Sequence, residues 1–387
     1  MSESAEELRS APAPESIFAD VDRDSTAPVA LEAVVSLLSL GFGRFWLVSS
    51  VRRHLCSNTK ILGDSLVYDG DALESLLQFA IGAAPLAGIC FAFYRFGSSL
   101  MGDNEAYLYL AAAIFVFTYW RAMRFADWRY RLNHTLWRGR RFRVDGSVAA
   151  YFLHAFEWGV VGAVSLGLAW PSAQVALDGH KLKHTHYGSR SFSFVGESPE
   201  LLSRGIFLLP VWLWCRVLLI FSVPAILVCN SALNENMRKM NPDDWRTGSA
   251  ADAAGRSMIL YILIVVVLLP IVAFAYPRFV ALVWKWWIEG VRFGEVYVTS
   301  GLKLSSFTGV YFAFYGFIVV FASLGLLVLS ALKGPSSADE TIHLIAVLYC
   351  CVIGLDAVWN WLFARRFWAI IVGSLALHDV SDLAEVS

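Results

Sequence analysis

The sequence predicts an all-α fold: a polytopic transmembrane helical bundle with tandem duplicated modules, re-entrant or broken segments and short interfacial β-like turns. Composition is the first reason. Hydrophobic residues make up 57% of the 387 residues and charged residues 16%, against about 45–50% and 25% in a typical soluble domain. Mean hydropathy is +0.56. So much apolar surface requires a lipid bilayer to cover it, which argues against a soluble, a disordered or a secreted disulfide-rich protein.

The second reason is the run of long apolar segments. Most are long enough to cross about 30 Å of hydrocarbon at a helical rise of about 1.5 Å per residue. Tryptophans gather near several of their ends, as expected at a membrane–water boundary. The eight segments are 30–50, 73–95, 104–121, 147–170, 205–229, 257–283, 307–332 and 341–363.

The third reason is an internal duplication. Ser39-Leu40-Gly41 recurs as Ser165-Leu166-Gly167, and the Gly-x-x-x-Glu-x-Leu pattern of 70–76 recurs at 196–202; both offsets are 126 residues. Between them, Thr59-x-x-x-Gly63 recurs as Thr185-x-x-Gly188, one residue shorter. Three matches in the same order indicate a repeated unit. The shared turn residues are Gly41, Thr59 and Gly63 in the first unit, and Gly167, Thr185 and Gly188 in the second.

This repeat divides the chain into four parts. Residues 1–29 are acidic and proline-containing, and we expect a disordered cytoplasmic tail without a cleavable signal peptide. Residues 30–156 form the first membrane module and residues 157–282 the second. Residues 283–387 form a third, degenerate module with the C-terminal tail.

A glycine followed after two residues by an aromatic residue also recurs, at 139–142 and 290–293, with a variant at 188–192. The residues around it alternate between polar and apolar, which is a strand period. We therefore expect short β-like segments between the helices at the membrane interface.

The distribution of basic residues favours one topology. If segments 30–50 and 147–180 enter the membrane and return on the same side, six segments cross. Lys and Arg residues then number 23 on the cytoplasmic side and 6 outside, leaving aside Arg44 and Arg216 within the segments. This is the bias that the positive-inside rule describes. It predicts a multi-pass protein of the bacterial inner membrane, with both termini in the cytoplasm. If all eight segments cross instead, this bias nearly disappears.

The duplicated units resemble the YjgN-like family of bacterial inner-membrane proteins, a domain family of unknown function. The similarity covers roughly residues 30–380. Gly43-Arg44-Phe45-Trp46 stands where the family has a Pro-Trp step. The resemblance implies location and architecture, and suggests a membrane metallopeptidase as a partner; it implies no activity. The matching positions are Leu40-Gly41-Phe42, Arg52-Arg53, Asn58-Thr59, Gly63, Tyr68-Asp69-Gly70, Leu166-Gly167-Leu168, Pro171, Thr185, Gly188, Gly196 and the run from Arg129 to Thr135.

Charged residues within apolar segments are candidate functional residues, because a charge at bilayer depth is costly and usually faces the interior of the bundle. Arg216 and Asp356 are two such residues. A pair between them would be a substrate or coupling site, or an ion pair that only fixes packing. His154 and Glu157 share one helix face and are candidates for a proton relay, or are simply hydrated.

A basic cluster lies in the loop before segment 147–170. It serves either to bind anionic lipid headgroups or only to set the topology. Because it directly flanks membrane segments, we expect no nucleic-acid binding. The cluster consists of Arg138, Arg140, Arg141 and Arg143.

The sequence indicates no enzyme and no cofactor. It contains no GxxxxGK[ST], GxSxG, HExxH or CxxC motif. His180, His184 and His186 lie among lysines, which favours an exposed loop over a metal site. Transport or channel-like passage of a small solute is the leading functional hypothesis, since duplicated, broken segments build the sites of many transporters. The alternatives are a scaffold or regulator of a partner such as a membrane metallopeptidase, and a membrane-embedded enzyme.

Overall fold

The computed structural model describes most of the chain in two compact units. One comprises Met1–Ser198 with Trp284–Ser387, and the other comprises Pro199–Val283. The second unit holds most of helix α8 (Ser198–Gly205) and the first part of α10 (Ser249–Gly290). The residues described are 15–16, 18–19, 34–36, 38–101, 105–165, 167–205, 249–332 and 337–380.

Helices dominate the first unit, and strands join them. The other helices are α3 (Arg44–Ser57), α4 (Ala72–Met101), α5 (Glu105–Asn133), α6 (Val148–Val164), α7 (Trp170–Lys183), α11 (Leu304–Ala331), α12 (Ser337–Val358), the π-helical turn η2 (Trp359–Phe363) and α13 (Ala364–Val372). The strands are β1 (Glu15–Ser16), β2 (Phe18–Ala19), β3 (Thr59–Ile61), β4 (Asp64–Ser65), β5 (Val67–Tyr68), β6 (Thr135–Trp137), β7 (Arg140–Val144), β8 (Thr185–Tyr187), β9 (Arg190–Phe194), β10 (Val291–Phe293), β11 (Val296–Ser300) and β12 (Leu375–His378).

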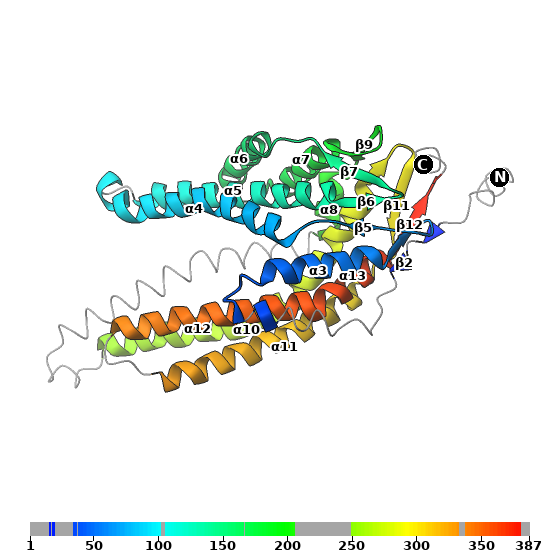
Figure 1. The fold of residues 1–387 in the computed structure, drawn as a ribbon. Helices are drawn as coiled ribbons and strands as arrows, with labels where there is room; N and C mark the ends of the chain where they lie inside the picture. Colours follow the sequence, from blue (N-terminus) through cyan, green and yellow to red (C-terminus); the bar gives the residue numbers. More distant parts are fainter. Residues whose placement is uncertain are drawn as a thin grey trace, which may run out of the picture. The chain divides into compact units, whose positions relative to one another are not determined.

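One local pattern occurs four times: a helix, a two-stranded hairpin and another helix. The hairpins β3–β4, β6–β7, β8–β9 and β10–β11 follow α3, α5, α7 and α10 and precede α4, α6, α8 and α11. In Figure 1 the strands gather at the right, and α4, α5, α11 and α12 extend leftwards from them. The predicted β-like segments at 139–142, 188–192 and 290–293 are therefore confirmed as parts of hairpins.

Two-residue turns with glycine close all four hairpins. Arg138 and Gly139 both have positive φ, of 47° and 74°, as a type I′ turn requires. Leu62 and Gly63 repeat this geometry. Gly188, with φ of 62°, is the first residue of its turn, which is the type II′ arrangement, and Gly294 repeats it. These turns match the right-handed twist of strands, so each hairpin folds on short-range information.

The strands form a far larger sheet than isolated hairpins would. Antiparallel pairing joins nine strands in the order β1-β12-β11-β10-β9-β8-β7-β6-β5, and three more as β2-β3-β4. Along the chain, β1 leads directly to β2 and β4 leads directly to β5, so the chain connects the two sheets at both ends. The twelve described strands therefore form a closed ring, called the β ring below. The expectation of an all-α fold is therefore wrong for this part: each hairpin leaves unpaired backbone groups at its edges, and neighbouring hairpins satisfy them.

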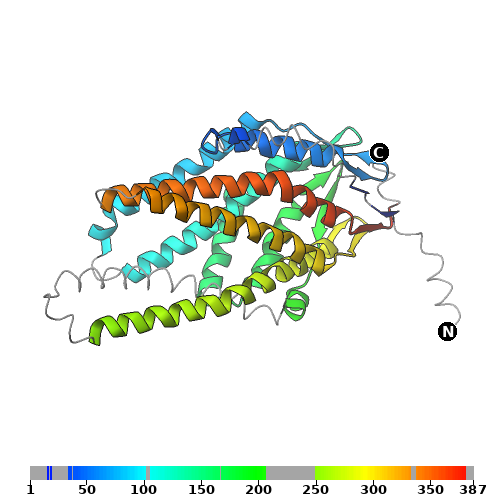
Figure 2. The same ribbon diagram turned by 90° about the horizontal axis from the view of Figure 1, so that it is seen from below.

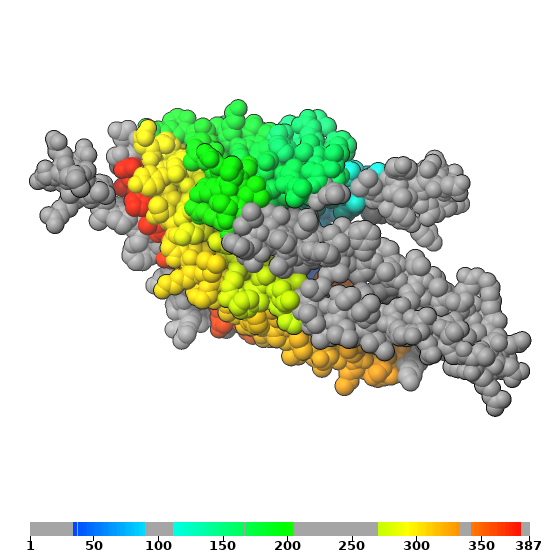
Figure 3. All heavy atoms as spheres, turned by 180° about the vertical axis from the view of Figure 1, so that it is seen from behind, coloured from blue at the N-terminus to red at the C-terminus, as the bar shows by residue number. Residues whose placement is uncertain are grey.

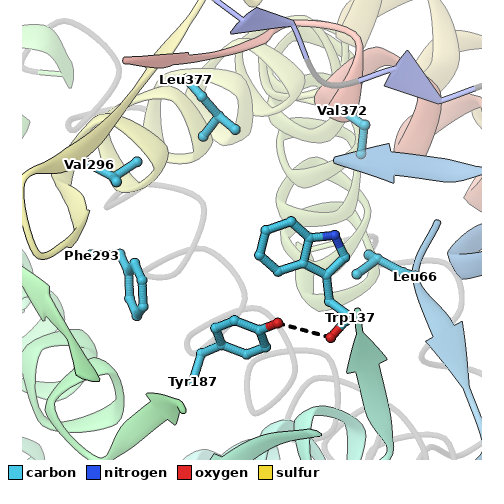
Figure 4. Packing of buried hydrophobic residues seen from close by; sticks show 7 residues of the cluster. All are labelled: Leu66, Trp137, Tyr187, Phe293, Val296, Val372 and Leu377. Carbon is cyan, nitrogen blue, oxygen red and sulfur yellow. Dashed lines mark hydrogen bonds between the residues drawn. The ribbon is translucent and has the colours of Figure 1, made fainter. Parts of the chain in front are cut away.

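A hydrophobic core lines the inside of this β ring and leaves an apolar cavity of about 200 Å³. The last residues of β6, β8 and β10 are Trp137, Tyr187 and Phe293, and all three are buried. They converge with Leu377 of β12 (Figure 4). The Tyr187 hydroxyl donates a hydrogen bond of 2.9 Å to the Trp137 carbonyl. Equivalent positions of different repeats thus build one core.

Both Ser-Leu-Gly motifs break a helix, as the sequence predicts. Gly41 and Gly167 have φ of 89° and 88°. The Ser39 hydroxyl accepts a hydrogen bond of 2.6 Å from the Gly43 amide, and the Ser165 hydroxyl accepts one of 3.1 Å from the Ala169 amide. The second break separates α6 from α7, so the chain turns back after α6. Leu166 lies outside the described residues.

Four helices among the described residues are long and apolar enough to cross a membrane: Ala72–Ile89, Pro270–Gly290, Leu304–Ala331 and Ile342–Val372. Helix α6, with 17 residues, is a shorter apolar helix and spans only about 25 Å. Residues 206–229 of the expected segment 205–229 and most of the expected tail 1–29 lie outside the described residues. Strands β1 and β2 lie within that tail and differ from the disorder expected there.

We predict that Gly139→Ala lowers the thermal unfolding midpoint of the purified protein. A Cβ atom at this position would meet nothing within 4 Å, so the cost is the positive φ alone, about 1 kcal/mol. Gly309→Ala is the control, because Gly309 lies in α11 with equally open space and alanine favours helices. An equal loss in both variants would contradict the assigned turn.

Candidate functional site: a cationic cavity

A cavity of about 500 Å³ lies among α3, α4 and α5. Its walls are mostly apolar, with three arginines and one aspartate among them. The lining residues are Arg44, Phe45, Val48, Arg52, Ser75, Gln78, Phe79, Ile81, Gly82, Trp120, Met123, Arg124, Ala126, Asp127, Tyr130 and Val148. Concave sites with apolar walls and a few convergent polar groups are typical of ligand-binding sites.

The direction of the three helices explains why polar residues gather at one end. Helix α3 ends at the first hairpin, α4 leaves that region, and α5 returns to the second hairpin. Arg52, Asp127 and Tyr130 therefore lie toward the strands. Arg44 lies eight residues before Arg52, about 12 Å further along α3. Trp120 lies at about the corresponding distance on α5, so Arg44 and Trp120 line the end of the cavity away from the strands.

Positive charge exceeds negative charge around this cavity. Asp127 lies 3.1 Å from Arg52 and 3.1 Å from Arg131. Arg44 lies 3.4 Å from Asp356. Two aspartates are thus shared by three arginines, and a further cation, the guanidinium of Arg124, lies 5.4 Å from the centre of the Trp120 ring. Among the residues that line the cavity, three arginines face one aspartate, and this excess of two positive charges favours an anionic ligand.

Tyr130 closes the end of the cavity nearest the strands. Its hydroxyl donates a hydrogen bond of 2.8 Å to the Asp71 carbonyl. Burial is the main cause that raises the pKa of Tyr130, and the nearby carboxylate of Glu74 adds to it. The phenol therefore stays protonated and remains a hydrogen-bond donor at neutral pH.

The candidate residue Asp356 pairs with Arg44, whereas the sequence suggests Arg216 as its partner. Its carboxylate faces Arg44, on the helix that follows the first Ser-Leu-Gly break. The proposed partner, Arg216, lies outside the described residues. The carboxyl group thus holds together α3 and α12, which are distant in the sequence.

His154 and Glu157 lie on one face of α6, as their spacing indicates, with 3.4 Å between Nδ1 and the carboxylate. The His154 ring also stacks on His180, which contacts the ring of His184. No metal-binding group of three or more His, Cys, Asp or Glu side chains occurs among the described residues. His186 belongs to β8 and lies 3.7 Å from Asp145 instead.

The basic cluster occupies the hairpin β6–β7, and three of its arginines have acidic neighbours. Arg138 and Arg141 pair with Asp64 and Asp69 of the first hairpin region, while Arg143 pairs with Asp145 and is 77% exposed. Arg140 is exposed on the same strand. Much of the charge of this cluster therefore links neighbouring hairpins.

Sequence reasoning missed the residues that line the cavity. Arg44 was set aside as one charge within an apolar segment, and Arg52 was only part of a family motif. One signal was present: Arg124, Asp127 and Arg131 are spaced by three and four residues and so share a helix face.

We predict that Asp127→Asn lowers the unfolding midpoint more than Asp145→Asn does. Asp127 of α5 is joined to α3 by Arg52, whose side chain is 24% exposed, and also pairs with Arg131 of its own helix, which is 40% exposed. Asp145 pairs with a mostly exposed arginine, where an ion pair contributes about 0–1 kcal/mol. Thermal unfolding in detergent measures both. An equal or smaller effect at Asp127 than at Asp145 would contradict the prediction.

A family model described as "Bacterial protein of unknown function (DUF898)" matches residues 30–386. The chain belongs to this family, which agrees with the expectation of a bacterial family without an established activity. No curated protein and no solved structure matches the chain.

Proposed function

We propose that this DUF898 member is a multi-pass inner-membrane protein that binds a small anionic solute in the cavity among α3, α4 and α5 and moves it across the bilayer. The excess of arginines over carboxylates around the cavity carries this proposal. Several long apolar helices support a membrane location. The proposal needs no catalytic step and no cofactor.

Exposed apolar side chains support the membrane part of the proposal. Val319 and Leu326 of α11 are 64% and 69% exposed, and Val352 of α12 is 64% exposed. Helices α11 and α12 run alongside one another (Figure 2). Apolar surface on this scale is unfavourable in water, and hydrocarbon would cover it.

Pairing of the hairpins supports the proposed topology. Phe142 of β7 pairs with Tyr187 of β8, and β9 pairs with β10; the hairpin β10–β11 is coloured yellow and β9 green in Figure 3. Three hairpins belong to the nine-stranded sheet, and the hairpin β3–β4 is tied to it by the single residue between β4 and β5. All four therefore lie on one side of any bilayer that the long helices cross. The proposal puts this arginine-rich side, and both termini, in the cytoplasm.

Single cysteines that replace Arg140 and Arg190, in a variant without other cysteines, are expected to react from the same side of the membrane. Both follow turns of hairpins whose strands pair. Labelling with an impermeant maleimide in intact cells and in inverted vesicles gives the sidedness. Reaction from opposite sides would contradict the return of α6 and α7.

Uptake of radiolabelled glycerol phosphate into proteoliposomes tests the function. We expect Arg124→Gln to reduce uptake at millimolar concentration at least about fivefold, because a cation near a bound anion contributes about 1 kcal/mol. Arg143→Gln is the control, since Arg143 lies outside the cavity and is 77% exposed.

Equal uptake by the two variants, or none by the wild type, would contradict the transport proposal. A wild-type protein without uptake that co-purifies with a stable partner, such as a membrane metallopeptidase, would favour the scaffold or regulator instead.

A further inference from the structure

A second cavity, of about 400 Å³, adjoins the cationic one. The two cavities share Arg44, Phe45 and Phe79 in their walls. The rings of Phe45 and Phe79 lie 5.5 Å apart. The guanidinium of Arg44 and this aromatic pair therefore mark the boundary between two adjoining spaces.

The second cavity is less polar than the first. Leu40, Phe42, Leu76, Val352 and Ile353 supply much of its wall. Two of its polar groups have partners inside the protein: the Tyr349 hydroxyl donates a hydrogen bond of 2.9 Å to the Leu40 carbonyl, and Asp356 pairs with Arg44. The hydroxyl of Ser36 also lines this cavity and has no hydrogen-bond partner among the described residues. Such a wall suits a hydrocarbon chain.

The two cavities also differ in their place along the helices. Asp127 and Tyr130 follow the apolar part of α5 and lie toward the strands. Val352 and Ile353 lie well inside the candidate span Ile342–Val372. Along the segment that leads into α3, the lining changes from Leu40 and Phe42 of the second cavity to Arg52 of the first. The cationic lining near the strands and the apolar lining within the span follow each other as the headgroup and the acyl chain of a lipid do in a bilayer.

We infer that the ligand is an anionic amphiphile, with a phosphate or carboxylate head in the cationic cavity and an aliphatic chain in the second cavity. This inference rests on the proposed function and names the class of its solute. Charge fixes the orientation: the first cavity has three arginines and one aspartate in its wall and attracts the head, whereas in the second cavity Arg44 is matched by Asp356. The aliphatic chain of the ligand passes between the two cavities at Phe45 and Phe79.

Native mass spectrometry of the full chain in non-ionic detergent tests this inference with three probes. Glycerol phosphate carries only the head, lysophosphatidylglycerol carries the head and one chain, and lysophosphatidylcholine carries the same chain on a zwitterionic head. Each buried methylene strengthens binding about fourfold. We therefore expect lysophosphatidylglycerol to bind at least about 100-fold more tightly than glycerol phosphate, and about 10-fold more tightly than lysophosphatidylcholine.

Two pairs of variants test which cavity holds the head of the ligand and which holds its aliphatic chain. Arg124→Gln is expected to remove the preference for the anionic lipid, whereas Arg143→Gln keeps it. Val352→Trp fills the second cavity and is expected to weaken lysophosphatidylglycerol at least 10-fold without changing glycerol phosphate. Val319→Trp is the matched control, because Val319 and Val352 are each 64% exposed but only Val352 lines the cavity.

The outcomes separate this inference from the proposed function. If glycerol phosphate binds as tightly as lysophosphatidylglycerol and depends on Arg124, the anion site stands and the amphiphile is excluded. If the two lipids bind equally, or Val352→Trp and Val319→Trp weaken the anionic lipid equally, the inference is overturned. If neither anionic probe binds, the anion site and the proposed function fall together with it.

Discussion

Edge-to-edge hydrogen bonding between hairpins is the constraint on which the rest of the first unit depends. Each hairpin is short, and an isolated hairpin is only marginally stable in water. Pairing of β7 with β8 and of β9 with β10 connects the units of the repeat and brings Trp137, Tyr187 and Phe293 into one core. The helices on either side of each hairpin are held at their ends by this pairing, and the walls of the cationic cavity are set by three of them.

Much of this local structure could be predicted from sequence, because it depends on short-range rules. Gly139 and Gly188 indicate turns, and Gly41 and Gly167 indicate helix breaks, since each position requires a backbone that most residues avoid. The pairing between hairpins could not be predicted in this way. Backbone groups make those bonds, so side-chain patterns at 142 and 187 do not identify their partners.

The same distinction applies to the cavity. The spacing of Arg124, Asp127 and Arg131 places them on one helix face, and this information is local. The approach of Arg52 to Asp127 spans 75 residues, and that of Arg44 to Asp356 spans several helices. A charge within an apolar segment signals a buried partner in general terms, but the identity of the partner depends on tertiary packing.

Strands β1 and β2 close the β ring, because one pairs with β12 and the other with β3. This closure has a consequence for biosynthesis. Glu15 pairs with Leu377, and Phe18 pairs with Lys60 of β3. These two strands therefore lie between the hairpin β3–β4 and β12, which comes far later in the chain. During synthesis β2 can cover the edge of β3 early, but β1 has no strand to join until β12 has been made. Closure of the ring thus waits for the synthesis of β12, long after the first hairpin can form.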